Sequence, residues 1–291
     1  MTDNKSNFAI SHPSRSAFTA FSLLMRSAAA ALILAACATP DTALADEPSA
    51  EIVPLLHAHA HNDYLHPRPL LDALDQGFCS VEADVFLVDG ELLVAHTQWE
   101  LDKNKTLKDL YLDPLSERAK QNGGRIYRDG PVFTLLLDFK KDGSAIYEIL
   151  DSLLAKYPDV FSVIKDGVST EKAVNVVISG DRPFQAIESD NERFVGIDGR
   201  LTDLDSDKPF NLMPMISDRW GDHFTWQGEG ELTAKERERL RMMVQRVHTK
   251  GRVLRFWAIP DNPNSWKVMR DAGVDLINTD DLSGLSEILR K

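Results

Sequence analysis

Short apolar, β-branched runs alternate with amphipathic stretches from residue 52 onward, and this alternation most constrains the fold. The runs interpreted as strands are 52–59, 80–88, 132–139, 173–179, 194–198, 212–217, 253–259 and 275–279. Helical spacing of apolar residues occurs at 69–76, 106–121, 144–156, 183–189, 233–250, 263–272 and 282–289. Strands that alternate with helices form a parallel sheet, because each helix carries the chain back to the same end of the sheet.

Eight strand–helix units in about 240 residues fit one (β/α)8 barrel, whose usual length is about 250 residues. An open, doubly wound sheet is the alternative architecture. No glycine-rich dinucleotide loop and no P-loop follows any of the runs, and Asp89-Gly90 is a tight hairpin signal after the second run. We therefore predict an α/β fold: a TIM barrel that forms a single domain over residues 46–291.

Residues 1–45 have the features of an export signal followed by a short linker. Three basic residues precede the apolar run 27–36, which is too short to span a bilayer. Two processing sites compete: a lipobox that would leave lipidated Cys37 as the mature N-terminus, and an A-x-A site at 43–45. Either site predicts export, to the periplasm, to a membrane as a lipoprotein anchored through Cys37, or to the medium.

The charge balance and the cysteine count narrow the possible partners. The chain has 33 basic and 45 acidic residues, a net charge of −12. Nucleic acid is therefore not expected as a partner, because a polyanion requires a basic face. A small phosphorylated ligand held by a cation is compatible with this charge. Once Cys37 is lipidated or removed, Cys79 is the remaining cysteine of two, so no intrachain disulfide is predicted.

Acidic side chains gather near the carboxyl ends of the predicted strands, where barrel enzymes carry their active sites. Glu82 and Asp84 are two residues apart on one strand and share a face, and Asp138 ends the next parallel strand. Three neighbouring carboxylates repel one another unless a cation compensates them. Their oxygen ligands suit Mg²⁺ or Ca²⁺. Ordinary strand-end carboxylates, one of them bonded to Lys140, are the alternative.

Two histidines, His61 and His96, stand at neighbouring strand ends, with the acidic pair between them in the sequence. Imidazoles on opposite sides of a phosphate can divide the proton transfers of a displacement. One imidazole accepts the proton of the nucleophile, and the other donates a proton to the leaving oxygen. The other histidines are interpreted as strand-lining or surface residues: His57, His59, His66, His223 and His248.

This ordered set resembles the phosphatidylinositol phospholipase C and glycerophosphodiester phosphodiesterase superfamily. The matching segments are His61-Asn62-Asp63, Glu82-x-Asp84, Ala95-His96-Thr97, Asp138-x-Lys140, Trp257 and the run 273–280. Within the superfamily, His-Asn-Asp-Tyr, Ser-Val-Glu-Ala-Asp-Val, Ile-Ser-Asp and Phe-Trp-x-x-Pro-Asp resemble the branch typified by the fungal "altered inheritance of mitochondria" proteins. The resemblance extends over residues 52–291.

The resemblance implies a metal-dependent phosphodiester hydrolase that acts on a glycerophosphodiester or a phospholipid-like substrate. Two departures concern the first histidine motif, where His-Asn-Asp replaces His-Arg-Gly, and the third metal position, where Asp138 replaces Glu as in sphingomyelinase D. The implied catalytic residues are His61, His96 and Lys140, the implied ligands of one Mg²⁺ or Ca²⁺ are Glu82, Asp84 and Asp138, and the implied substrate-binding residues are Asn62, Asp63, Arg182 and Trp257.

Two other functions are compatible with parts of the pattern. A zinc amidohydrolase-like barrel is suggested by the His-x-His of the first strand, since zinc favours imidazole ligands. The predicted fourth, fifth, seventh and eighth strands add no further histidine, which argues against it. An exported binding protein without turnover is the other alternative. Pure binding requires no acid–base pair, so the presence of His61 and His96 favours an enzyme.

Overall fold

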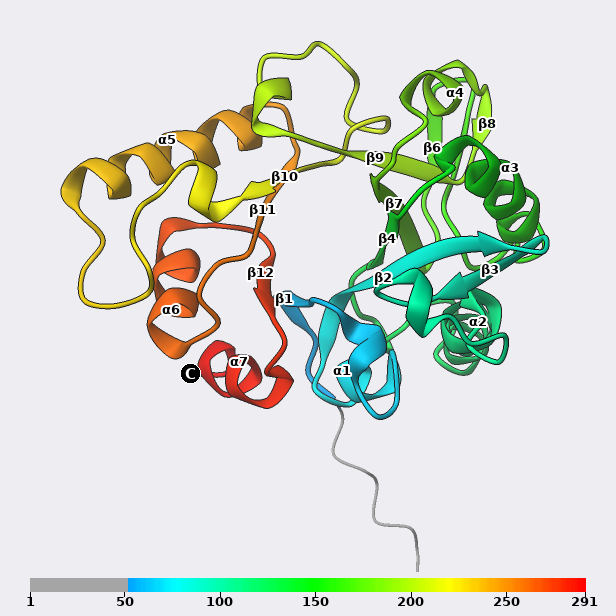
Figure 1. Ribbon diagram of the computed structural model, residues 1–291, viewed down its shortest axis with the longest axis horizontal. Helices are drawn as coiled ribbons and strands as arrows, with labels where there is room; N and C mark the ends of the chain where they lie inside the picture. Colours follow the sequence, from blue (N-terminus) through cyan, green and yellow to red (C-terminus); the bar gives the residue numbers. More distant parts are fainter. Residues whose placement is uncertain (1–51) are drawn as a thin grey trace, which may run out of the picture. The chain divides into compact units, whose positions relative to one another are not determined.

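The computed structural model describes residues 52–291, and the predicted export signal with both processing sites lies outside the described residues. Eight parallel strands form a ring, with helices on the outside (Figure 1). In chain order and in barrel order they are β1 (Leu55–Ala60), β2 (Phe78–Val88), β4 (Phe133–Phe139), β7 (Val174–Gly180), β9 (Val195–Gly199), β10 (Met215–Arg219), β11 (Val253–Trp257) and β12 (Ile277–Thr279).

Closure of the barrel joins the first and last strands of the chain. Strand β12 pairs in parallel with β1, and a single bridge between Arg255 and Leu276 links β11 to the residue just before β12. The predicted TIM barrel is thereby confirmed, because each apolar run contains or overlaps one barrel strand.

The helices follow the seven predicted amphipathic stretches. They are α1 (Leu71–Asp75), α2 (Asp113–Gln121), α3 (Gly143–Leu154), α4 (Phe184–Ser189), α5 (Ala234–Thr249), α6 (Pro263–Ala272) and α7 (Leu282–Leu289). The connection from β9 to β10 contains a 3-10 turn, Leu201–Asp203, and no α-helix, so the expected eighth strand–helix unit is incomplete there. Within residues 52–291, no helix has both the length and the apolar character needed to cross a membrane.

The hairpin predicted at Asp89-Gly90 is present and places the second histidine. Asp89 and Gly90 both have positive φ, 52° and 86°, as the tight turns that match strand twist require. The turn joins β2 to the antiparallel strand β3 (Glu91–Val94), which ends two residues before His96. A small sheet of β5 (Val163–Lys165), β6 (Val168–Thr170) and β8 (Glu192–Arg193) adds to the predicted elements.

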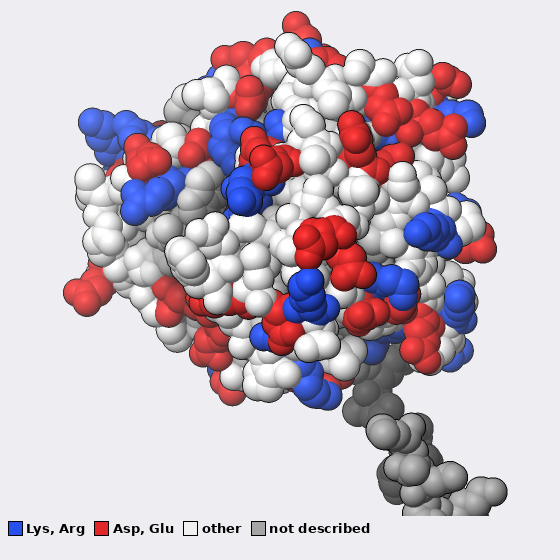
Figure 2. All heavy atoms as spheres, turned by 45° about the vertical axis from the view of Figure 1, so that its right-hand side comes forward, with Lys and Arg blue, Asp and Glu red and all other residues white. Residues whose placement is uncertain are grey.

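The barrel lumen is apolar in its middle and polar at the carboxyl ends of the strands. Inward-facing side chains that close the middle are Leu136, Val177, Met215 and Leu276, with Val253 packed against them. Asp138 on β4 and Ser179 on β7 stand two residues after Leu136 and Val177, toward the carboxyl ends of the strands. Asp84 on β2 is in register with them. The apolar plug therefore forms the floor under a polar site. On the face drawn in Figure 2, basic and acidic side chains are interspersed rather than gathered by sign.

Candidate active site

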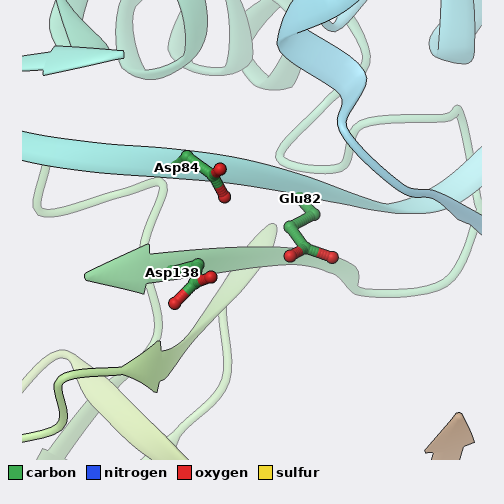
Figure 3. A group of neighbouring side chains, drawn as sticks. All are labelled: Glu82, Asp84 and Asp138. Carbon is green, nitrogen blue, oxygen red and sulfur yellow. The ribbon is translucent and has the colours of Figure 1, made fainter. Parts of the chain in front are cut away.

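Three carboxylates meet at the carboxyl end of the barrel, as the sequence predicts. Figure 3 shows Glu82 and Asp84 on β2 and Asp138 on β4, with their carboxylates facing the same space. One oxygen from each residue lies within 4.8 Å of the others. The two-residue period of β2 aligns the first pair, and the register between Asp84 and Asp138 adds the third. Glu82 and Asp84 are buried, so their mutual repulsion requires compensation.

Two cationic side chains provide that compensation. The Nζ atom of Lys140 lies 2.7 Å from Asp84 Oδ2 and 2.8 Å from Asp138 Oδ2. Arg255 Nη2 donates to Glu82 Oε2. Burial raises the pKa of Asp84 and also acts to raise the pKa of Glu82, but the charge of Arg255 holds the pKa of Glu82 well below its usual range. Burial alone would lower the pKa of Lys140, and the bond to Asp138 raises it instead, so Lys140 stays charged.

The carboxylate oxygens left over fit a hard divalent cation. Every hydrogen bond that Glu82 and Asp84 receive from the described residues goes to Oε2 and Oδ2, respectively. Asp138 Oδ1 is buried and has no hydrogen-bond partner among these residues. A Cβ at Gly180, which has a φ of 69°, would lie 1.9 Å from this oxygen, so glycine leaves room for the carboxylate. Oxygen donors of this kind suit Mg²⁺ or Ca²⁺.

His61 follows β1 and is oriented by a residue from the far end of the chain. Its Nδ1 lies 2.9 Å from Asp280 Oδ1, just after β12, and 2.9 Å from the side-chain nitrogen of Asn62. Burial acts to lower the pKa of His61, but the bond to Asp280 and the charge of Glu82 outweigh it, so that the pKa is raised. With Nδ1 directed at a carboxylate, Nε2 is left for the substrate.

His96 lies across the acidic cluster and has the same kind of partner. Its Nδ1 is 3.1 Å from Asp84 Oδ2 and 3.0 Å from the hydroxyl of Tyr64. Tyr64 also donates to Asp84 Oδ2 at 2.6 Å and stacks against the imidazole, with ring centroids 6.5 Å apart. The side chain of His96 remains 55% exposed, so Nε2 can reach a ligand. Both histidines therefore have Nδ1 against a carboxylate.

One cavity of about 260 Å³ joins these groups. It is lined by His61, Asn62, Glu82, Asp84, His96, Asp138, Lys140, Ser179, Gly180, Arg200, Arg255 and Trp257. The structure thus brings together the two predicted histidines, the three predicted metal ligands, Lys140, Asn62 and Trp257. Trp257 forms the wall with Arg200, whose guanidinium lies 4.9 Å from the centre of the indole ring.

Two residues predicted to bind substrate lie outside this lining. Asp63 is fully buried, and its carboxylate accepts hydrogen bonds from the backbone of Leu70 at 2.6 Å and from Tyr111 at 2.8 Å. Burial raises the pKa of Asp63 to about 6. Arg182 donates to the backbone carbonyl of Asp198. Their contacts give both residues a place in the scaffold behind the cavity rather than on its surface.

The sequence predictions give no role to Tyr64, Arg200, Arg255 and Asp280, or to Ser179 and Gly180 of the cavity lining. Arg255 had a usable signal, because it stands two residues before Trp257 on one strand and so shares its face. Arg200 similarly stands two residues after the buried Asp198, and its Nη1 lies 2.8 Å from that carboxylate. The partners of Tyr64 and Asp280 depend on side-chain orientation in loops.

A fully buried histidine beneath the site predicts acid sensitivity of the fold. His59 Nδ1 lies 2.7 Å from Ser80 Oγ and Nε2 lies 3.4 Å from Glu82, while burial lowers the pKa of His59 to about 4. An unfolded histidine binds a proton near pH 6.5, so below that pH the unfolded state binds more protons and stability falls as pH falls toward 4. The full loss is about 3 kcal/mol.

Urea unfolding at pH 7 and pH 4 measures this loss. His59→Gln should reduce the difference in unfolding free energy between the two pH values. The matched control is His57→Gln, because His57 is exposed and bonds the backbone carbonyl of Asp275. Equal pH dependence in the wild type and in His59→Gln would contradict the assignment.

The eight-stranded barrel, the acidic cluster and the flanking histidines together define the class of phospholipase C-like phosphodiesterase barrels. A family model described as the AIM6-like phosphodiesterase domain matches residues 46–198, and one described as the glycerophosphoryl diester phosphodiesterase family matches residues 253–283. The first match covers more than half of the chain. The chain belongs to the AIM6-like phosphodiesterase family, which confirms the resemblance found in the sequence.

The chain is similar to two fungal proteins and to one solved structure. "Altered inheritance of mitochondria protein 6 homolog" of Arthroderma benhamiae is 28% identical over 80% of this chain and 83% of its own length. "Altered inheritance of mitochondria protein 6" of Eremothecium gossypii is 30% identical over 81% of this chain and 70% of its own length. The crystal structure of a glycerophosphodiester phosphodiesterase from Agrobacterium tumefaciens is 13% identical, covers 82% of this chain and 100% of its own, and has a TM-score of 0.48.

Proposed function

We propose that the chain is a metal-dependent phosphodiester hydrolase that acts on a glycerophosphodiester or a phospholipid-like substrate. The observation that carries the proposal is the cavity in which two imidazoles and three carboxylates converge. One Mg²⁺ or Ca²⁺ would be held by Glu82, Asp84 and Asp138. Such a cation supplies Lewis-acid stabilisation of the charge that develops on phosphate oxygens.

The two histidines would divide the proton transfers. Asp280 and Asp84 each lie against the Nδ1 atom of one imidazole, which leaves both Nε2 atoms for the substrate. One Nε2 accepts the proton of the nucleophile, a water molecule or a substrate hydroxyl, while the other donates its proton to the departing oxygen. Water gives a phosphomonoester and an alcohol, and a substrate hydroxyl gives a cyclic phosphate and an alcohol.

The remaining lining residues would bind and orient the substrate. Lys140 offsets negative charge on the phosphate oxygens from its position between Asp84 and Asp138. Asn62 contacts His61 and borders the cavity, and Trp257 with Arg200 walls the side where the leaving group would lie.

We further propose that the protein is exported, either as a lipoprotein anchored through Cys37 or as a periplasmic or secreted protein, and that nucleic acid is not its substrate.

The contacts of the histidines favour this function over a zinc hydrolase. His57 Nδ1 bonds the backbone carbonyl of Asp275, and His59 bonds Ser80 and Glu82 in the barrel interior. Among residues 52–291, the group of three or more candidate metal ligands that converges is the carboxylate cluster, and it contains no histidine. A binding protein without turnover would not require both imidazoles at one cavity.

The test is turnover of a defined substrate panel with each cation in large excess over the protein, so that a weak site is also loaded. Glycerophosphocholine, glycerophosphoethanolamine and lysophosphatidylcholine are incubated with Mg²⁺, Ca²⁺ or Zn²⁺, and products are followed by ³¹P NMR, which separates cyclic phosphates from monoesters. We expect turnover with Mg²⁺ or Ca²⁺ on at least one diester. Absence of phosphodiester cleavage with every cation would contradict the proposed function.

A further inference from the structure

A buried arginine beside the acidic cluster compensates Glu82 but has no part in the proposed binding of cation and substrate. Arg255 lies on β11, is 2% exposed and lines the cavity. Its Nη2 donates to Glu82 Oε2, and its Nε donates to Asn278 Oδ1 at 2.8 Å. The bond to Asn278, a residue of β12, fixes the guanidinium against the carboxylate. The guanidinium carries a positive charge.

Arg255 sets the net charge of the acidic cluster before and after a cation binds. The three carboxylates are opposed by two cations, Lys140 and Arg255, which leaves the cluster with a single net negative charge when no metal ion is bound. Arg200 also lines the cavity, but its ion pair with Asp198 adds no net charge. Binding of a divalent cation reverses that sign. A phosphodiester carries one negative charge, so it is repelled by the metal-free cluster and attracted by the loaded one. Without Arg255, loading would end at net neutrality.

We propose that Arg255 couples the cation to the substrate: it weakens binding of the free divalent cation and strengthens binding of the phosphodiester anion once the cation is present. The inference rests on the proposed function, since it assigns Arg255 a charge-setting role at the same site. The two effects have opposite signs because one fixed positive charge repels the cation and attracts the anion. By linkage, the anion in turn tightens cation binding.

The experiment compares Arg255→Gln with Arg255→Lys. Mg²⁺ binding is measured by isothermal titration calorimetry on protein freed of metal, and inorganic phosphate binding is measured on the Mg²⁺-loaded protein. Arg255→Gln should bind Mg²⁺ roughly tenfold more tightly or better, and its loaded form should bind phosphate more weakly by a similar factor. Arg255→Lys keeps the charge and should stay close to the wild type in both titrations.

A matched control separates charge from packing. Arg252 is equally buried, lies three residues earlier and donates to the backbone carbonyls of Asp203, Ser206 and Lys208, away from the cavity. Arg252→Gln should change neither affinity. Thermal unfolding adds a second readout: Mg²⁺ should raise the Tm of Arg255→Gln more than that of the wild type, because the cation then replaces the missing charge.

The outcomes separate this inference from the proposed function. If the wild type binds Mg²⁺ and cleaves phosphodiesters but Arg255→Gln weakens both affinities, Arg255 is a structural residue and the inference alone is wrong. Failure of Arg255→Gln to fold even in excess Mg²⁺ has the same meaning. If the wild type binds no divalent cation, the proposed metal site and the inference both fall. Opposite shifts in the two affinities support both.

Discussion

Asp138→Asn is expected to lower kcat/KM by roughly 10³-fold or more on a phosphodiester that the wild type cleaves. The reason is that the cation supplies several kcal/mol of transition-state stabilisation. The substitution removes one of three ligand charges, and Asp138 Oδ1 is the buried oxygen without a hydrogen bond from the described residues. Complete removal of cations with a chelator should abolish turnover by the wild type and by Asp138→Asn alike. Addition of Mg²⁺ or Ca²⁺ should restore the wild type fully and Asp138→Asn only in part.

Mg²⁺ titration by calorimetry shows whether the loss comes from the metal site. Asp138→Asn and Glu82→Gln should both weaken Mg²⁺ binding. Asp142→Asn is the matched control, since Asp142 is an exposed residue with a φ of 58°, a conformation that asparagine tolerates, and it lies four residues beyond Asp138. Undiminished turnover by fully chelated wild-type protein would refute the metal site.

The strands could be predicted because the physical signal is local. A strand buried on both faces in a parallel barrel reads as a short continuous apolar run, and β4 with β7 shows this plainly. The acidic cluster could be predicted for a related reason. The two-residue period of β2 fixes Glu82 and Asp84 on one face, and the neighbouring strand of a parallel sheet supplies Asp138 at the same level.

The partners of these residues could not be predicted, because they depend on closure of the barrel and on side-chain orientation. Arg255 and Glu82 are 173 positions apart, and His61 and Asp280 are 219 positions apart. Only the pairing of β12 with β1 brings the latter two together. The orientation of Asp63 could not be predicted either, because it depends on the backbone conformation of a single turn. Its neighbour Asn62 has a φ of 48°, which turns the chain so that Asn62 borders the cavity and Asp63 points into the scaffold.

His61→Ala and His96→Ala are each expected to lower kcat by ~10²–10⁴-fold, the usual contribution of a general acid or base. The metal site should survive, because neither imidazole is among the three candidate ligands. Calorimetry should therefore show Mg²⁺ binding close to the wild type in both variants. The controls are His57→Ala and His66→Ala, which change histidines outside the cavity and should keep most of the activity.

The double variant and the pH profile distinguish a catalytic pair from two independent contacts. Because the two imidazoles act on one displacement, His61→Ala/His96→Ala should lose less than the product of the single losses.

The raised pKa of His61 depends on its bond to Asp280. Asp280→Asn should therefore lower that pKa and shift the corresponding limb of the kcat/KM profile to lower pH, while Asp281→Asn should leave it in place. A His96→Ala protein with near wild-type turnover would show that His96 takes no part in proton transfer, and a pH profile unmoved by Asp280→Asn would remove Asp280 as the residue that orients His61.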